Sequence, residues 1–154
     1  MSRGRVVATV LALAYTALLF FLTLGPIRQR LIGDEAPGGV LNPVIWLAAE
    51  TWRSGRLYEF VANVIVFVPW GFLVLLALGI RWWWVAAFAG LALTLTIEIG
   101  QIPLPRISDP RDLVANVLGT LVGIALAVPL VRRRDAALRR RSSLERGGEK
   151  LLQG

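Results

Sequence analysis

The chain has 154 residues, of which 56% are hydrophobic, and its net charge of +7 comes from 17 basic and 10 acidic residues. This composition excludes an ordinary soluble domain, because a water-soluble protein of this size needs a polar surface to cover its core. Cysteine and histidine are absent, which excludes a disulfide framework, a thiolate nucleophile and any Cys/His metal site.

Four long apolar blocks organise residues 1–131 into one membrane domain. At about 1.5 Å per residue, a helix of roughly 20 residues crosses the hydrocarbon core of a bilayer. The blocks predict transmembrane helices over about 6–24, 60–79, 82–100 and 113–131. The first block is longer than the core of a signal peptide and is not followed by a small-x-small cleavage site, so we expect it to stay in the protein.

The segment between the first two blocks combines loop and helix signals. The stretch "DEAPGGVLNP" (34–43) is rich in Pro and Gly, which is typical of a loop. Ile45, Trp46, Ala49 and Trp52 then recur at helical spacing. This pattern predicts a short amphipathic helix in the membrane interface, and a lid packed over the bundle is the alternative.

Basic residues are distributed unevenly between the two sides of the predicted bundle. Four spans place both termini on one side, which carries eleven basic residues, against six on the other. Because Lys and Arg accumulate in cytoplasmic loops, we expect both termini in the cytoplasm. The net charge then reports topology, with no nucleic-acid partner, and residues 132–154 form a flexible basic tail. The eleven are Arg3, Arg5, Arg81, Arg132, Arg133, Arg134, Arg139, Arg140, Arg141, Arg146 and Lys150, and the six are Arg28, Arg30, Arg53, Arg56, Arg106 and Arg111.

Polar residues of three spans meet at one depth, near the outer face. They stand at the start of the second span, at the end of the third and at the start of the fourth. Helical spacing lets each set share one face of its helix. We therefore expect a cluster of candidate ligand-binding side chains, flanked by a basic loop residue. These candidates are Asn63, Glu98, Gln101, Arg106, Asp109, Asp112 and Asn116.

Small residues predict how the helices approach one another. Gly119 and Gly123 form a G-x-x-x-G pattern that allows close helix contact. Pro69 removes a backbone donor inside the second span, and Gly71 follows two residues later. We expect these four positions to contribute to helix packing and to bring the polar faces together.

The acidic residues of the cluster differ in what explains them. Ser108 or Asp109 before Pro110 is typical of a helix N-cap, and Asp112 then lies in the first turn, where the helix dipole favours negative charge. Glu98 has no such explanation, and a carboxyl inside a membrane helix costs a few kcal/mol. We expect it to face the bundle, paired with an arginine or asparagine of the cluster or protonated. An interhelical polar clasp and a functional pocket are the two alternatives.

Two stretches, "NVIVFVPWGF" (63–72) and "LTIEIGQIPLPRISDPRDLVANVLGTLVG" (95–123), resemble the VanZ-like family of small bacterial membrane proteins. The resemblance covers about residues 60–127, and the Asp109-Pro110 pair departs from the family's usual loop. It implies a multi-pass protein of the bacterial plasma membrane with a role in the cell envelope. The family is named for a protein that confers low-level resistance to teicoplanin, and the resemblance implies no particular reaction. The matching positions are Glu98, Gln101, Asp109, Asp112, Asn116 and Gly119.

Three functions are consistent with this sequence. The first is a non-enzymatic module that binds an envelope lipid, a glycan, or a cell-wall precursor or glycolipid in the outer-leaflet pocket, without a cofactor. The second is an intramembrane enzyme in which Glu98 acts as a general base, or in which Glu98, Asp109 and Asp112 hold a divalent cation. The third is an accessory scaffold whose polar cluster only joins helices. Membrane lipids are expected partners, whereas the sequence indicates no protein partner.

Overall fold

The computed structural model describes residues 3–25, 38–54, 56–103 and 108–151, and within these ranges the chain is helical and has no strand. Four helices are long and apolar enough to cross a membrane, which confirms the prediction of an all-α membrane fold. They are α1 (Arg3–Leu24), α4 (Leu57–Leu78), α5 (Trp83–Gln101) and α6 (Pro110–Leu151). The shorter elements are η2 (Gly39–Leu41), α2 (Pro43–Leu47), α3 (Ala49–Ser54) and η3 (Ile80–Trp82).

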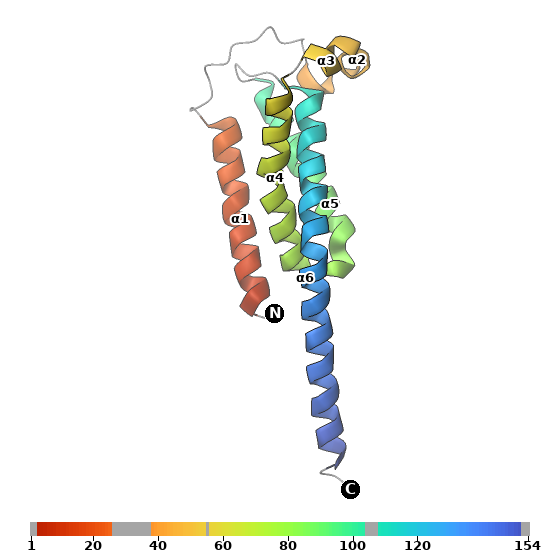
Figure 1. Ribbon diagram of the computed structural model, residues 1–154. Helices are drawn as coiled ribbons and strands as arrows, with labels where there is room; N and C mark the ends of the chain where they lie inside the picture. Colours follow the sequence, from red (N-terminus) through yellow and green to blue (C-terminus); the bar gives the residue numbers. More distant parts are fainter. Residues whose placement is uncertain (1–2, 26–37, 55, 104–107, 152–154) are drawn as a thin grey trace.

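The four long helices run side by side, and the two ends of the bundle differ (Figure 1). We call the end that bears η2, α2, α3 and the start of α6 the loop end, and the end at which α1 begins the terminal end. Both chain termini lie toward the terminal end (Figure 1). In place of the single interfacial helix expected after residue 43, two short helices, α2 and α3, lie at the loop end.

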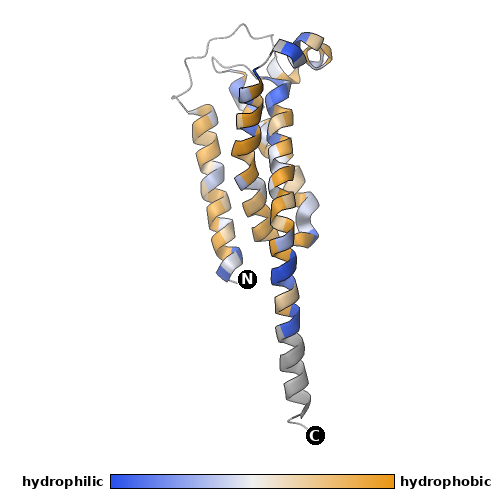
Figure 2. Cartoon of the chain, viewed as in Figure 1, coloured by the Kyte–Doolittle hydropathy of each residue, from blue (hydrophilic) through white to orange (hydrophobic). Residues whose placement is uncertain are grey.

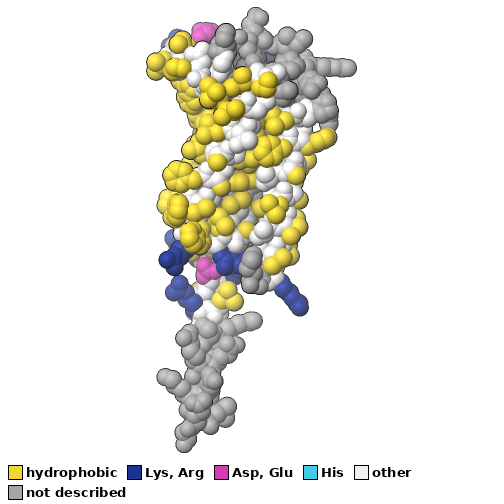
Figure 3. Space-filling model, turned by 180° about the vertical axis from the view of Figure 1, so that it is seen from behind, with side chains coloured by type: hydrophobic (Ala, Val, Ile, Leu, Met, Phe, Trp, Pro, Cys, Tyr) yellow, Lys and Arg dark blue, Asp and Glu magenta, His cyan; other side chains and the backbone are white. Residues whose placement is uncertain are grey.

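The surface of the bundle is apolar over most of its length. Figure 2 shows hydrophobic residues along all four long helices, with hydrophilic residues concentrated at the ends and along the part of α6 that extends from the bundle. Figure 3 shows the same belt from behind, with Lys and Arg gathered at the terminal end. Trp82, Trp83 and Trp84 are all exposed there, as expected for an aromatic belt at a membrane interface.

Glycines set the contact between α4 and α6, the closest pair of helices in the bundle. A Cβ atom added at Gly119 or Gly123 would collide with the backbone carbonyl oxygen of Val64 or Val68, respectively, and one at Gly71 with that of Thr120. The two backbones therefore touch directly, as small residues allow in membrane helices. Pro69 lies inside α4 but is exposed, because it is about 200° around the helix from Gly71.

Helix α1 is attached along one side of this pair. The Tyr15 hydroxyl donates to the Val66 carbonyl oxygen at 2.8 Å, and the Trp70 indole N–H donates to Thr16 Oγ1 at 2.8 Å. Leu19 packs in a buried cluster with residues of α4 and α5. These contacts hold the last turns of α1 beside the polar ends of α4 and α5.

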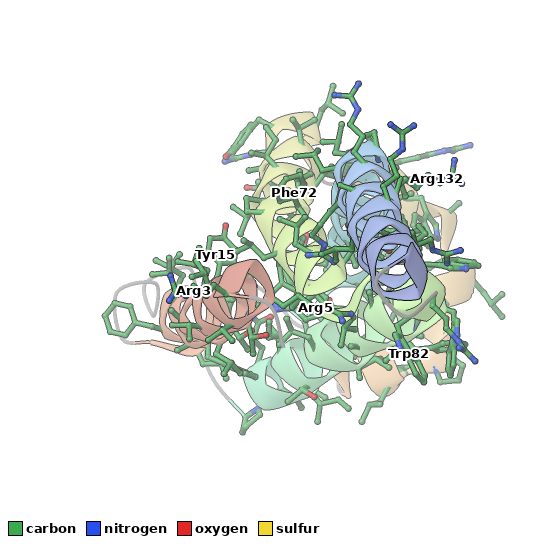
Figure 4. All side chains as sticks on the ribbon, turned by 90° about the horizontal axis from the view of Figure 1, so that it is seen from below. Arg3, Arg5, Tyr15, Phe72, Trp82 and Arg132 are labelled. Carbon is green, nitrogen blue, oxygen red and sulfur yellow. The ribbon has the colours of Figure 1, made fainter. Side chains whose placement is uncertain are left out.

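Arginines cap α4 at the terminal end. Arg5 donates to the carbonyl oxygens of Ala77 and Leu78, and Arg134 donates to that of Leu76 at 2.9 Å. These carbonyls belong to the last turn of α4, which has no intrahelical partners for them. Figure 4 shows Arg5 pointing from α1 toward the rest of the bundle.

The segment after residue 131 differs from the flexible tail that the sequence suggested, because α6 continues without interruption to Leu151. Residues 130–146 contain neither Gly nor Pro and are rich in Arg, Ala and Leu, all strong helix formers. Since the membrane-spanning part already supplies a nucleated helix, each added residue only extends it.

Candidate functional site

A partly open cavity of about 270 Å³ lies at the loop end, lined by residues of α1, α4, α5 and α6. Six of the seven predicted ligand-binding residues line it, and the seventh, Arg106, lies outside the described residues. The sequence had therefore grouped residues from α4, α5 and α6 that do converge in space. The lining consists of Thr23, Arg56, Tyr58, Glu59, Phe60, Ala62, Asn63, Phe67, Ile97, Glu98, Gln101, Asp109, Arg111, Asp112 and Asn116.

Glu98 is buried at 1% exposure, as expected for a carboxyl that faces the bundle. Its Oε2 atom accepts hydrogen bonds from Ser108 Oγ at 3.3 Å and from the Asp109 backbone N–H at 3.2 Å. These donors replace the arginine or asparagine partner that the sequence suggested. The physical reason is that the approach to an N-terminal helix end presents unpaired N–H groups to a neighbouring carboxylate.

Ser108 connects Glu98 to the outer short helices, a role that sequence reasoning missed. Its Oγ also accepts a hydrogen bond from the Val40 backbone N–H in η2 at 3.0 Å. The Val40 carbonyl oxygen in turn accepts from Trp46 Nε1 at 2.9 Å. The segment before α4 thus contacts Ser108 through η2, while α2 exposes Val44 and Leu47. No sequence pattern predicted this contact, since it joins residues 68 positions apart.

Asp109 is the N-cap of α6, which confirms one of the two capping residues that the sequence allowed. Its Oδ1 accepts from the Arg111 backbone N–H at 2.8 Å, and its carbonyl oxygen accepts from the backbone N–H groups of Asp112 and Leu113. Burial raises the pKa of the Asp109 carboxyl, although the N–H and the charge of Arg111 oppose this rise. Asp109 therefore holds the start of α6 and also lines the cavity.

Asn116 is the residue of the cavity lining that lies farthest along α6. It lies six residues into α6, about 9 Å along the helix axis from Pro110. Its Nδ2 donates to Thr94 Oγ1 of α5 at 2.8 Å, but its buried Oδ1 has no hydrogen-bond partner. Closer to the mouth, Asn63 of α4 and Asp112 of α6 also line the cavity.

The remaining polar groups close the sides and the rim of the cavity. Gln101 Nε2 donates to the Thr23 carbonyl oxygen of α1 at 3.3 Å. At the rim, Arg56 donates to the Tyr58 hydroxyl at 2.8 Å, and that hydroxyl donates to Glu59 at 3.1 Å. This rim was not predicted from the sequence. Its only sequence signal was a cluster of polar residues at the start of the second span.

A protein-family model matches the part of the chain that forms the bundle and the cavity. The model of the VanZ/LLP1 family matches residues 10–132. The chain belongs to the VanZ/LLP1 family. Its matched range begins in α1, ends in α6 and contains all the residues that line the cavity. Among curated proteins and among solved structures, no match to the chain was found.

The acidic side chains that line the cavity are those of Glu59, Glu98, Asp109 and Asp112. Among the described residues, no group of three or more acidic side chains is close enough together to hold a metal ion. The divalent-cation set of Glu98, Asp109 and Asp112 therefore lacks a shared coordination centre, although all three line the cavity. Membership in the VanZ/LLP1 family and the four apolar helices together identify a multi-pass membrane protein.

Proposed function

We propose that this VanZ/LLP1 protein is a non-enzymatic binding module of the bacterial plasma membrane. Its cavity takes the polar headgroup of an envelope lipid or glycan from the outer leaflet. The observation that carries the proposal is the buried Oδ1 of Asn116, which lacks a hydrogen-bond partner in a residue that lines the cavity. A buried polar atom left unpaired costs about 1–3 kcal/mol, and a bound hydroxyl or amine would recover it.

The cavity favours a ligand over a closed polar clasp. In a clasp, buried polar atoms pair with one another and leave little space between them. Here about 270 Å³ separates polar groups of four helices. Ligand pockets of about 300–1,000 Å³ hold drug-sized molecules, so this one suits a small headgroup rather than an entire lipid.

The uneven distribution of basic residues supports an orientation with the loop end outside the cell and both termini in the cytoplasm. Arg3 and Arg5 lie in the first turn of α1, Arg81 lies in η3, and the arginines that follow residue 131 lie beyond the apolar part of α6, all toward the terminal end. The chain has no cysteine, so single cysteines give a test free of background. A cysteine at Gly38 should react with an impermeant maleimide in intact cells, whereas one at Ala137 should react only after lysis. The reverse pattern would refute the orientation.

The binding function itself is tested with two isosteric variants, Glu98→Gln and Asp112→Asn, and a matched control, Asp135→Asn. Asp135 pairs with Arg134 at the terminal end, away from the cavity. In a host whose glycopeptide susceptibility depends on this protein, the two cavity variants should lose the effect at normal membrane abundance. The control should keep it.

Full activity of both cavity variants would overturn the binding function and favour a scaffold, in which the polar cluster only joins helices. Purified protein incubated with labelled lipid-linked envelope precursors separates binding from catalysis. We expect stoichiometric retention of the precursor, and turnover to a product would instead support the enzyme.

A further inference from the structure

More acidic than basic side chains line the cavity. Four carboxylates line it, from Glu59, Glu98, Asp109 and Asp112, whereas the only basic side chains on its described walls are those of Arg56 and Arg111. An ionised carboxylate accepts hydrogen bonds only, so a ligand that binds these side chains in their ionised form supplies the donors. A positively charged donor supplies these hydrogen bonds and also opposes the acidic charge of the lining. Its hydrogen bonds to carboxylates are charge-assisted.

The polar side chains of the cavity also differ in depth. Glu98 and Asn116 are 1% and 4% exposed, whereas Arg56 is exposed at the rim and Arg111 is half-buried. Two acceptors therefore lie deeper than either arginine, while Asp109 and Asp112 are half-buried like Arg111. A ligand with a cationic end would enter with that end first and leave any anionic group beside the two arginines.

The unpaired Oδ1 of Asn116 is an independent sign of a donor-bearing ligand. Its own Nδ2 is already engaged by Thr94, and the Asn116 backbone oxygen accepts from Thr120 Oγ1 at 3.0 Å. Only the amide oxygen remains without a partner, and it is an acceptor. An N–H group on the ligand would donate the missing hydrogen bond to this oxygen, whereas a trimethylated nitrogen has no hydrogen to donate.

A metal ion fits this arrangement less well than an ammonium group. A divalent cation needs several oxygen atoms within about 2.0–2.6 Å of one centre, and the acidic side chains of the described residues do not come together in that way. An ammonium group has three donors, each of which can reach a separate acceptor.

We propose that the cavity selects a primary ammonium group, carried by an ethanolamine phospholipid headgroup or by an amino sugar of an envelope glycan. This inference rests on the proposed binding function and narrows its ligand class. Glu98, Asp112 and Asn116 receive the N–H donors, and Arg56 and Arg111 lie beside the phosphate or the remainder of the glycan.

The test compares soluble headgroup probes on the purified full-length protein by calorimetric titration. Glucosamine is paired with glucose, and phosphoethanolamine with phosphocholine and with glycerol phosphate. We expect at least one primary amine to bind ten times or more tightly than its matched partners. A preference confined to phosphoethanolamine identifies the lipid as the source, and a preference confined to glucosamine identifies the sugar.

Variants locate the preference within the cavity. Asp112→Asn removes one carboxylate with little change in shape, so the amine preference should fall severalfold, while Asp135→Asn should leave it unchanged. If Asp112→Asn does not fold, the comparison of probes on the unsubstituted protein still decides the question. Equal affinity for the amines and their matched partners would overturn the ammonium selectivity and leave the binding function standing. Binding of no probe would overturn both.

Discussion

Replacing Gly123 by alanine should separate α4 from α6 and destabilise the bundle. An alanine Cβ at this position would meet Phe72 N at 2.7 Å and the Val68 carbonyl carbon at 3.0 Å, and would collide with the Val68 carbonyl oxygen. All these are backbone atoms, which cannot rotate away as a side chain can. Ordinary van der Waals contact begins at 3.4 Å, so the two helices have to move apart by at least ~0.7 Å to relieve the Phe72 contact alone.

A gap of this size has a predictable energy. Separation by about 0.5–1 Å forfeits a quarter to a half of the dispersion attraction between the facing atoms, and overpacking of a tight interior typically costs about 1–3 kcal/mol. Alanine is about 1 kcal/mol better than glycine inside a helix, which offsets part of this loss. We therefore expect a net destabilisation of up to about 2 kcal/mol.

Gly100→Ala is the matched control for this substitution. A Cβ at Gly100 would meet only the end of the Leu24 side chain, at 3.3 and 3.4 Å, and that side chain can adjust. The control should therefore be neutral or slightly more stable than the parent protein. Both variants are measured by reversible unfolding in mixed micelles. If Gly123→Ala unfolds at the same midpoint as Gly100→Ala, the close backbone contact of α4 and α6 does not contribute to stability as argued.

Three further predictions concern the polar contacts. Ser108→Ala should lower stability by about 1–3 kcal/mol and speed amide exchange in η2, because it removes the hydroxyl that joins Glu98 to that turn; unchanged exchange would contradict this link. Tyr15→Phe should lower stability by about 0.5–1.5 kcal/mol through loss of the bond to the Val66 carbonyl, and an unchanged unfolding midpoint would exclude that contribution. Because burial raises the pKa of Asp109 above 3.8, the native state binds this proton more tightly than the unfolded chain. The resulting stability is fully present below pH 3.8 and is lost as the pH rises through the raised pKa. The stability of Asp109→Asn relative to the parent protein should therefore increase as the pH rises from below 3.8 to neutral. A difference in unfolding midpoint that does not change with pH would refute the raised pKa of Asp109.

Most residues of the candidate site could be predicted from the sequence, because helical spacing and the position of polar residues in apolar spans identify them. Glu98 and Gln101 are three residues apart on one helix, and topology places their end of the span beside Asp112 and Asn116. A charged group inside an apolar span is unfavourable in lipid, so its presence indicates a partner or a cavity.

The partners of these residues were not visible. The bonds from Ser108 and from the Asp109 backbone to Glu98 depend on how the loop between α5 and α6 returns. The position of α1, whose Thr23 closes one side of the cavity, depends on side-chain packing against α4. Neither the return of a loop nor the choice of a packed face follows from a hydropathy pattern.

The sequence by itself determined the number of membrane spans and the end of the bundle at which polar groups gather, and it limited the cap of α6 to Ser108 or Asp109. These properties follow from hydrophobic length and from backbone hydrogen bonding within a few residues. Tertiary structure alone decided that the gathered groups enclose about 270 Å³ and leave Asn116 Oδ1 without a partner. The reason is physical. The volume of an internal cavity depends on how closely the helix backbones approach, which the glycines set, and on how far every side chain extends between them. That volume depends on all four helices at once.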